Sequence, residues 1–342
     1  MGACRRRVGI RITTSVVLAV VTVLGGADVA SASQPREGSG DRLFVVTTVS
    51  PITSIVSSVA GGLVEIRGLI PEGADSHTFE PPPSAAEALS KADLVFVNGL
   101  KLEDPTKDLA RENLKDGAEV VELGTKAIPE REYLYDFSFP RAGGKPNPHL
   151  WTNPPYARRY ARIVADALER RDPAHDAQYE ENYRAFAAKV DELDQAMRTA
   201  TASMTTQQRK LLTYHDAYAY FAEHYGWKVV GAVQVSSFED PTPREVARLI
   251  SQVKTQGVPA IFGSEVFPSP VLEQIGNEAG VRYVDELRDD DLPGDPGDNE
   301  HSWLGLMKFD FVTMVKNLGG DTSALDAVDI RSRTRDTAEY PQ

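Results

Sequence analysis

The sequence predicts an α/β fold of two lobes, each a mostly parallel sheet of about four strands with flanking helices, joined by one long helix. Short β-branched and apolar runs alternate with helix-patterned segments over residues 42–171, and the alternation restarts after residue 204. Such alternation is typical of parallel sheets with helices on their faces. Between the two halves, apolar residues recur at spacings of 4, 3, 4, 3 and 4, which predicts a single helical stripe. The stripe consists of Tyr179, Tyr183, Phe186, Val190, Leu193 and Met197.

The N-terminal lobe is expected over residues 42–171. Its strand-like runs lie at residues 43–48, 64–70, 94–97 and 119–123. Helical spacing follows at residues 52–60, 84–89 and 155–170, and a polar helical segment follows Gly99. Residues 129–148 are rich in Pro, Gly and aromatic side chains, which favours a long loop. Asp172 and Pro173 then fit the cap and first position of the linking helix, expected over residues 172–204.

The C-terminal lobe is expected over residues 205–320. Its strand-like runs lie at residues 210–214, 229–233, 260–264 and 281–287. Helix-patterned segments follow them at residues 216–225, 242–256, 270–279 and 302–318. The remaining residues, 321–342, are polar and are expected to form a flexible tail.

The N-terminus resembles a secretion signal. Four arginines precede a nine-residue apolar run at residues 16–24, which is too short to span a bilayer. Ala30-Ser31-Ala32 fits a small-residue cleavage site, so we expect a signal peptide over residues 1–32 that is cleaved near Ala32. The polar stretch 33–41 then forms a flexible leader. The alternative is an N-terminal membrane anchor.

Composition limits the classes of function. The chain has 342 residues, is 41% hydrophobic and carries a formal charge of −13, which predicts a buried core and argues against a nucleic-acid partner. Cys4 is the single cysteine and lies in the predicted signal peptide. The mature protein is therefore expected to have no disulfide and no thiolate ligand, and any zinc-like site must use His and carboxylate groups.

Three histidines share one local setting. His77, His149 and His215 each lie in or just after a strand-like or loop segment and just before a helical one. Neutral imidazole is the commonest protein ligand for transition metals. His77 follows the second strand of its lobe and His215 the first strand of the other, where parallel sheets place their ligands. The pattern predicts one site at the interface of the lobes, although any one of these histidines alone is more simply read as structural.

A tetrahedral site needs a fourth ligand. The best candidates from position lie in Asp289-Asp290-Asp291, after the last strand, although most of the acidic run 289–300 fits a solvated loop. Glu80 and Glu265 are candidates to orient a histidine, with a structural role equally open. The other three histidines are interpreted as structural, and the least certain is the one nearest the acidic run; they are His175, His224 and His301.

These residues resemble the solute-binding proteins of ABC transporters for zinc and manganese. The resembling stretches are residues 73–84, 90–100, 147–151, 215–218, 220–221, 243–254 and 305–308. The resemblance covers residues 43–318. It implies two lobes bridged by a rigid long helix with one metal ion between them, held by His77 and His149 from the first lobe and His215 from the second.

The resemblance also implies an acidic last ligand, which Asp290 fits best. Asp285, Asp289 and Asp291 are its rivals. Two features depart from many members: residues 129–147 contain no histidine, and no cysteine offers a lipid attachment point. Three His and one Asp suit either Zn²⁺ or Mn²⁺, and intrinsic affinity favours Zn²⁺.

Capture and delivery of a metal ion to an ABC permease, without catalysis, is the function that these features predict. Four protein ligands leave no open position for the water that catalytic zinc sites keep. A secreted zinc-dependent hydrolase is the main alternative, but the sequence has no H-E-x-x-H. A surface adhesin with a structural metal is a second alternative, without supporting repeats. We expect an exported monomer, periplasmic or at the cell surface, where further surface partners remain open.

Overall fold

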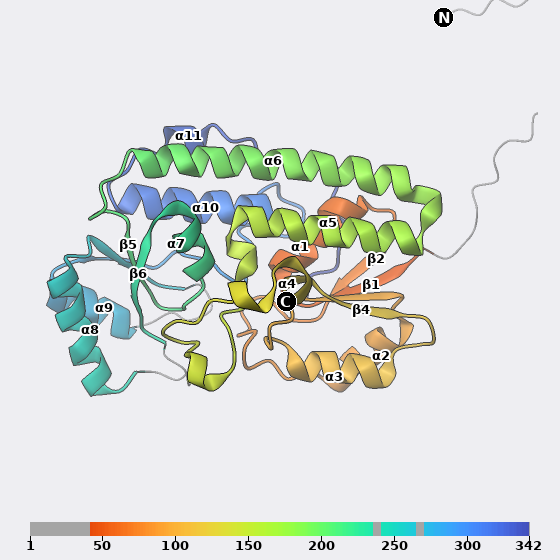
Figure 1. Ribbon diagram of the computed structural model, residues 1–342, viewed down its shortest axis with the longest axis horizontal. Coiled ribbons are helices and arrows are strands. Elements are labelled where there is room, and N and C mark those ends of the chain that lie inside the picture. The colour runs from red at the N-terminus through yellow and green to blue at the C-terminus, as the bar shows by residue number, and fades with distance from the viewer. Residues whose placement is uncertain (1–41, 235–240, 265–269, 342) are drawn as a thin grey trace, which may run out of the picture. The chain divides into compact units, whose positions relative to one another are not determined.

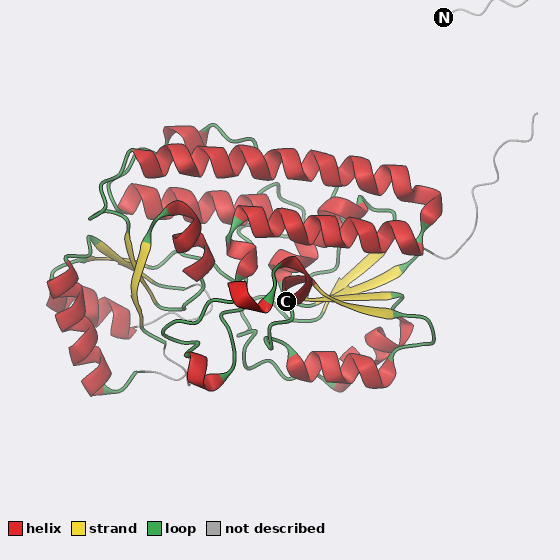
Figure 2. Ribbon diagram, in the orientation of Figure 1, coloured by secondary structure: helices red, strands yellow, loops and turns green. Residues whose placement is uncertain are grey.

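Two parallel sheets lie under one long helix in the computed structural model, which describes residues 42–234, 241–264 and 270–341 (Figures 1 and 2). The two-lobe α/β prediction is thereby confirmed. The predicted signal peptide, its cleavage site and the leader fall outside the described residues. No helix in the described ranges is both long and apolar enough to cross a membrane.

The N-terminal sheet has the strand order β2-β1-β3-β4, and all its pairs are parallel. Its strands are β1 (Phe44–Thr47), β2 (Glu65–Gly68), β3 (Leu94–Val97) and β4 (Glu119–Glu122). Its helices are α1 (Ser50–Ala60), α2 (Pro83–Lys91), α3 (Asp104–Asn113), α4 (Leu123–Ala127) and α5 (Pro154–Arg171). Four of these helices carry a proline in the first two positions, where the missing N–H costs no hydrogen bond.

The C-terminal sheet repeats this topology in the order β6-β5-β7-β8. Its strands are β5 (Lys210–Thr213), β6 (Lys228–Ala232), β7 (Ala260–Phe262) and β8 (Arg282–Val284). Its helices are α7 (Ala219–Tyr225), α8 (Pro243–Gln256), α9 (Pro270–Ala279) and α10 (Trp303–Asn317). Thr242 and Glu245 form a capping box that fixes the start of α8.

The linking helix α6 (Asp176–Ala202) runs over both lobes and follows a 3₁₀ turn at Pro173–His175 (Figure 1). Five of the six predicted stripe residues are buried on it, and Tyr183 is half-buried. The stripe packs on α5, α1 and α10. The inner faces of both sheets thus share one apolar core with α6, while smaller clusters fill the outer faces under α2 and α3 and under α8 and α9.

The helix predicted from residue 216 begins three residues later, at Ala219. The carbonyl groups of Asp216 and Ala217 do not start a helix because they accept hydrogen bonds from the other lobe. Asn147 Nδ2 donates to Asp216 O at 2.7 Å, and Thr152 Oγ1 donates to Ala217 O at 2.8 Å. Contacts between the lobes therefore override the local helical pattern here.

The C-terminal segment crosses back to the N-terminal lobe, in contrast to the flexible tail expected from its composition. A short helix, α11 (Ser323–Asp326), packs on α6. Further along, Glu339 pairs with the edge strand β2: Gly68 N donates to Glu339 O, and Glu339 N donates to Ile66 O, both at 2.9 Å. An edge strand leaves backbone groups open to pairing, which the polar composition of the segment does not reveal.

Candidate metal centre

The three predicted histidines meet at the junction of the lobes. The Nε2 atoms of His77 and His149 are 3.1 Å apart, those of His77 and His215 are 3.1 Å apart, and those of His149 and His215 are 3.0 Å apart. Within the described part of the chain, this is the one group of three or more His, Cys, Asp or Glu side chains with ligand atoms this close. Its members come from three separate segments of both lobes.

Local hydrogen bonds set the backbone around each ring. His77 lies in the turn after β2, where its N–H donates to Asp75 Oδ1 at 2.9 Å. His149 precedes the 3₁₀ turn Leu150–Thr152, and its carbonyl accepts from Thr152 Oγ1 at 2.9 Å. His215 follows β5, and its carbonyl accepts from Thr213 Oγ1 at 2.6 Å. Each ring is thus presented by a loop at the end of a regular element.

Two side-chain amides orient the rings from behind. Asn147 Oδ1 accepts a hydrogen bond from His149 Nδ1 at 2.8 Å, and Gln234 Oε1 accepts one from His215 Nδ1 at 2.8 Å. Glu80 and Glu265 are the candidates for this role from the sequence. Glu80 is exposed, and Glu265 lies outside the described residues. The Asn-Pro-His spacing was an available signal for Asn147, whereas nothing near Gln234 pointed to the site.

Burial favours the neutral form of His77 and His149. His149 is 0% exposed and His215 is 3% exposed. Burial, followed by the charges of His215 and Lys145, lowers the pKa of His77 well below its usual 6.5. Burial, followed by the charges of His215 and His77, does the same to the pKa of His149. A neutral imidazole has a lone pair that can bind a metal ion, so these rings can act as metal ligands without first losing a proton.

The acidic loop meets the site from the C-terminal lobe, and its three aspartates have different partners. Asp289 Oδ2 lies 3.6 Å from His215 Nε2, and Asp289 Oδ1 accepts from Ser264 Oγ at 3.1 Å. Asp290 Oδ2 accepts from Ser76 N, the residue before His77, at 3.3 Å.

The other two acidic rivals have partners outside the cluster. Asp291 Oδ2 accepts from Gly73 N at 2.8 Å, and Asp285 is exposed beside Tyr283. The loop therefore brings Asp289 and Asp290 to the histidine segments. Neither carboxylate belongs to the close group of three rings.

Buried side chains from both lobes hold this loop. Trp151 lies two residues beyond His149, and its Nε1 donates to Asp289 O at 2.8 Å. The Tyr218 hydroxyl donates toward Arg288 O at 2.8 Å and toward Asp310 Oδ2 at 2.9 Å. Asp310 Oδ1 also accepts from Arg288 N at 3.0 Å. The backbone that carries the aspartates is thus tied to the His149 segment, the His215 segment and α10.

A half-buried and a buried carboxyl group, those of Asp136 and Asp216, lie behind the rings. Asp136 Oδ2 accepts from Asn147 Nδ2 at 2.8 Å, and Asp216 Oδ2 accepts from Ser138 N at 3.0 Å. Burial raises the pKa of Asp136, and burial together with the neighbouring Asp136 raises the pKa of Asp216 well above its usual value. The shifts favour protonation, so the pair presents less negative charge than two free carboxylates.

A cavity of about 330 Å³ opens beside His77, the least buried of the three rings. Leu100, Phe139 and Lys145 contribute to its lining, and the Phe139 ring lies 5.5 Å from the His77 ring between centroids. The cavity offers a route between the cluster and the solvent on the side of the loop 129–148.

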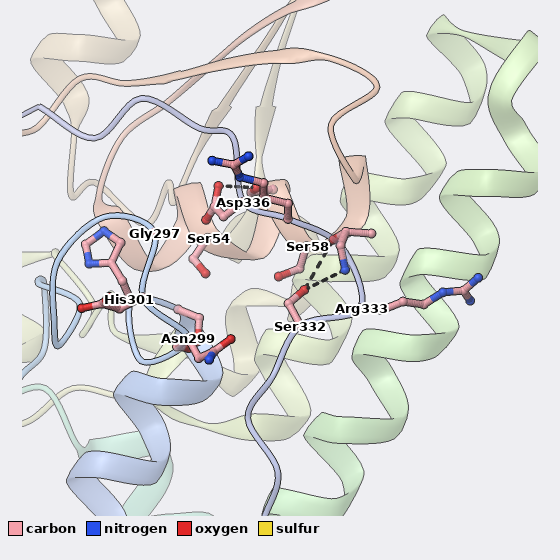
Figure 3. A pocket seen from close by; sticks show the side chains of 13 residues that line it. Ser54, Ser58, Gly297, Asn299, His301, Ser332, Arg333 and Asp336 are labelled. Carbon is pink, nitrogen blue, oxygen red and sulfur yellow. Dashed lines mark hydrogen bonds between the residues drawn. The ribbon is translucent and has the colours of Figure 1, made fainter. Parts of the chain in front are cut away.

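The other three histidines each lie beside a carboxylate away from the cluster. His175 pairs with Asp172 at 2.6 Å and His224 with Asp194 at 2.7 Å. His301 is buried 3.6 Å from Glu72, against the Tyr340 ring. It lines a separate polar pocket of about 280 Å³, together with Ser54, Ser58, Asn299 and Ser332 (Figure 3).

Comparisons with known proteins find relatives over most of the chain. Residues 45–317 match the model of the family described as zinc-uptake complex component A, periplasmic. The manganese-binding lipoprotein MntA of Halalkalibacterium halodurans is 28% identical over 305 residues, covering 89% of this chain and 97% of the relative. The iron-binding protein YfeA of Yersinia pestis is 29% identical over 279 residues, covering 81% and 87%.

A solved structure shows the same architecture. The periplasmic zinc-binding protein TroA from Treponema pallidum superposes with a TM-score of 0.73 at 27% identity, covering 81% of this chain and 99% of that one. The two lobes and the long helix thus agree with a match over most of the chain. On this evidence the chain belongs to the family of periplasmic zinc-uptake A components.

Proposed function

We propose that the chain captures one divalent transition metal ion between its lobes and delivers it to an ABC permease in the membrane. The convergence of three Nε2 atoms at 3.0–3.1 Å carries the proposal. A tetrahedral zinc site with Zn–N bonds of about 2.0–2.1 Å separates its ligand nitrogens by roughly 3.3 Å. The three rings therefore need only a small outward shift to surround an ion.

Asp290 is proposed as the fourth ligand, with Asp289 as its rival. In favour of Asp290 is its hydrogen bond to the loop that carries His77. In favour of Asp289 is the 3.6 Å between its Oδ2 and His215 Nε2. Three neutral imidazoles do not compensate the charge of the ion. One carboxylate ligand offsets part of that charge.

The ion is proposed to be Zn²⁺ or Mn²⁺, one per chain. Relatives of this chain are named for manganese and iron, and the TroA structure is named for zinc. Three nitrogen ligands and one carboxylate suit borderline ions, and the Irving–Williams order favours Zn²⁺ over Mn²⁺ at equal supply. Metal loading with both ions present measures this preference directly.

Delivery rather than catalysis is proposed because three histidines and one aspartate complete a four-coordinate site. A secreted hydrolase would need an open position and a general base beside it. We further propose that the chain acts outside the cytoplasm as a monomer, after cleavage near Ala32, with a membrane permease as its partner.

Metal content by mass spectrometry tests the proposal. The chain from residue 33 onward is stripped with a chelator, reloaded with equimolar Zn²⁺ and Mn²⁺, and desalted. We expect about one ion per chain in the parent, and loss of that ion in His77→Ala and His215→Ala. The matched control, His175→Ala, removes a histidine bonded to Asp172 and keeps the ion. Retention of a full ion in both site variants would contradict the proposal.

The two aspartates are separated by a second experiment. Asp290→Asn and Asp289→Asn are compared in a competition titration against a chromogenic chelator. We expect the larger loss of affinity in Asp290→Asn, because a metal ligand is lost there and only a neighbour in Asp289→Asn. The reverse order would assign the fourth ligand to Asp289. A hydrolase with three histidine ligands would keep its metal in both variants.

A further inference from the structure

The outer partners of two histidine rings are neutral amides. His149 donates from Nδ1 to Asn147 Oδ1, and His215 donates from Nδ1 to Gln234 Oε1, both at 2.8 Å. An amide oxygen only accepts hydrogen bonds, so the ring proton resides on Nδ1. The lone pair of each Nε2 then faces the cluster. The amides therefore fix the tautomer that a metal ion requires.

The orientation of the Asn147 amide is itself fixed. Its Nδ2 donates to Asp136 Oδ2 at 2.8 Å and to Asp216 O at 2.7 Å. Its Oδ1 also accepts from His149 N at 3.0 Å. A flipped amide would place Nδ2 against the His149 N–H donor and Oδ1 against the Asp216 carbonyl oxygen, and both of these bonds would be lost. The Asp136 carboxylate is therefore linked to the His149 ring only through the Asn147 amide.

A carboxylate in the same position would act differently. Metal-binding histidines commonly donate to a carboxylate, which raises the basicity of the ring and tightens the metal. An amide oxygen accepts the same hydrogen bond and so orients the ring in the same way, but it carries no charge. The two rings are therefore held in the binding geometry but kept less basic than a carboxylate would make them.

We propose that Asn147 and Gln234 are positioning residues that set the metal affinity at a level from which the ion is released. This inference rests on the proposed function, because a capture protein must surrender its ion to a partner. A less basic ring bonds the ion less tightly. The neutral amides therefore favour release of the ion.

The first test exchanges one amide for a carboxylate. Gln234→Glu keeps the shape and the acceptor of the side chain and adds a charge beside His215. We expect about tenfold tighter binding of Zn²⁺ and of Mn²⁺, with release to excess chelator slowed by the same factor. Gln234→Leu removes the acceptor and is expected to weaken binding. Damage to the structure would weaken binding in both variants, so the gain in Gln234→Glu distinguishes tuning from a merely structural role.

Two controls accompany this pair of variants. Gln274→Glu adds the same charge on exposed α9, away from the histidines, and should leave affinity and release unchanged. The parent and His215→Ala establish whether metal binds at the cluster at all. If the parent takes up no metal, the proposed function fails. If the parent binds through the cluster and Gln234→Glu does not tighten it, only the tuning proposal is overturned.

A charge-neutral exchange tests the other amide. The double variant Asn147→Asp with Asp136→Asn moves a carboxylate next to His149 without altering net charge, and it keeps a hydrogen bond between the two positions with donor and acceptor reversed. We expect tighter binding and slower release than in the Asp136→Asn single variant. Equal or weaker binding in the double variant, with an unchanged melting temperature of the metal-free protein, would overturn the proposal for Asn147.

Discussion

The two lobes share one strand order but differ in the regularity of their sheets. Each strand of the N-terminal sheet has four residues and pairs without interruption. In the C-terminal sheet, β7 and β8 have three residues each, and the pairing of β5 with β6 shifts between Leu211 and Leu212. The first sheet is thus the more regular scaffold. The second relies more on the loops and helices attached to it.

This difference shows in how each lobe presents its metal ligands. His77 and His149 lie in turns held largely by their own neighbours in sequence. The acidic loop is instead held from a distance, by Trp151, Tyr218 and Asp310. The C-terminal side of the site therefore depends on contacts distant in sequence, of which the one from Trp151 crosses the junction of the lobes.

Two tryptophans form the centre of that junction. Trp303 Nε1 donates to Trp151 O at 2.9 Å, and Trp151 Nε1 donates to Asp289 O at 2.8 Å. Both rings are fully buried. They connect the start of α10, the His149 segment and the acidic loop in one series, so the comparison between the lobes is best tested there first.

The largest effect is expected from Trp303→Ala. The loss of a fully buried indole, together with its hydrogen bond, should lower the free energy of unfolding by about 3–5 kcal/mol. Equilibrium denaturation in guanidinium chloride measures the change. Phe137→Ala is the control, because that ring is 44% exposed and its removal should change stability by less than about 0.5 kcal/mol. Similar losses of unfolding free energy in the two variants would show that the buried ring at the junction contributes no more to stability than the exposed one.

A second pair of variants compares the outer layers of the two lobes. Leu89 on α2 and Leu272 on α9 are both 0% exposed, one in each outer cluster. Each Leu→Ala change should cost about 2–5 kcal/mol. Because both sheets share one inner core, we expect a single unfolding transition in both variants, followed by circular dichroism and tryptophan fluorescence. Two separate transitions in Leu272→Ala would show that the C-terminal lobe unfolds on its own.

Tyr218→Phe tests the support of the acidic loop without emptying the core. The variant removes the hydroxyl that donates toward Arg288 O and Asp310. We expect about tenfold weaker metal binding, the size typical for outer partners of a metal site. Tyr225→Phe removes a hydroxyl that donates to Asp194 on α6, away from the acidic loop, and should leave affinity unchanged. Equal affinities of Tyr218→Phe and the parent would mean that the loop is held adequately by its remaining contacts.

The smallest effect concerns pH. Burial lowers the pKa of folded His149, whereas the unfolded chain has an ordinary value of about 6.5. The stability linked to neutral His149 is therefore present above about pH 6.5 and is lost as the pH falls, because the unfolded state then binds the extra proton. The metal-free parent should lose stability relative to His149→Asn between about pH 7.5 and pH 5.5, measured by denaturation. A pH-independent difference would contradict neutral burial of this ring.

The local pattern of the chain was sufficient to predict most of the regular structure. Residues 94–97 and 270–279 form the strand and the helix that their composition predicts, and the spacing from Tyr179 to Met197 gives the buried stripe of α6. The restart of the strand–helix alternation gave two lobes. These features follow from periodicity and capping, which act between neighbours in sequence.

What depends on distant contacts was not readable from the chain. The three histidines were identifiable by type and setting, but Gln234 behind His215, the late start of α7 and the return of Glu339 to β2 were not. Each of these is decided by a hydrogen-bonding group far away in sequence. The periodicity of the sequence shows which face of a helix or strand is buried. The partner that this face contacts is determined only when the lobes come together, because buried polar groups must then find donors and acceptors.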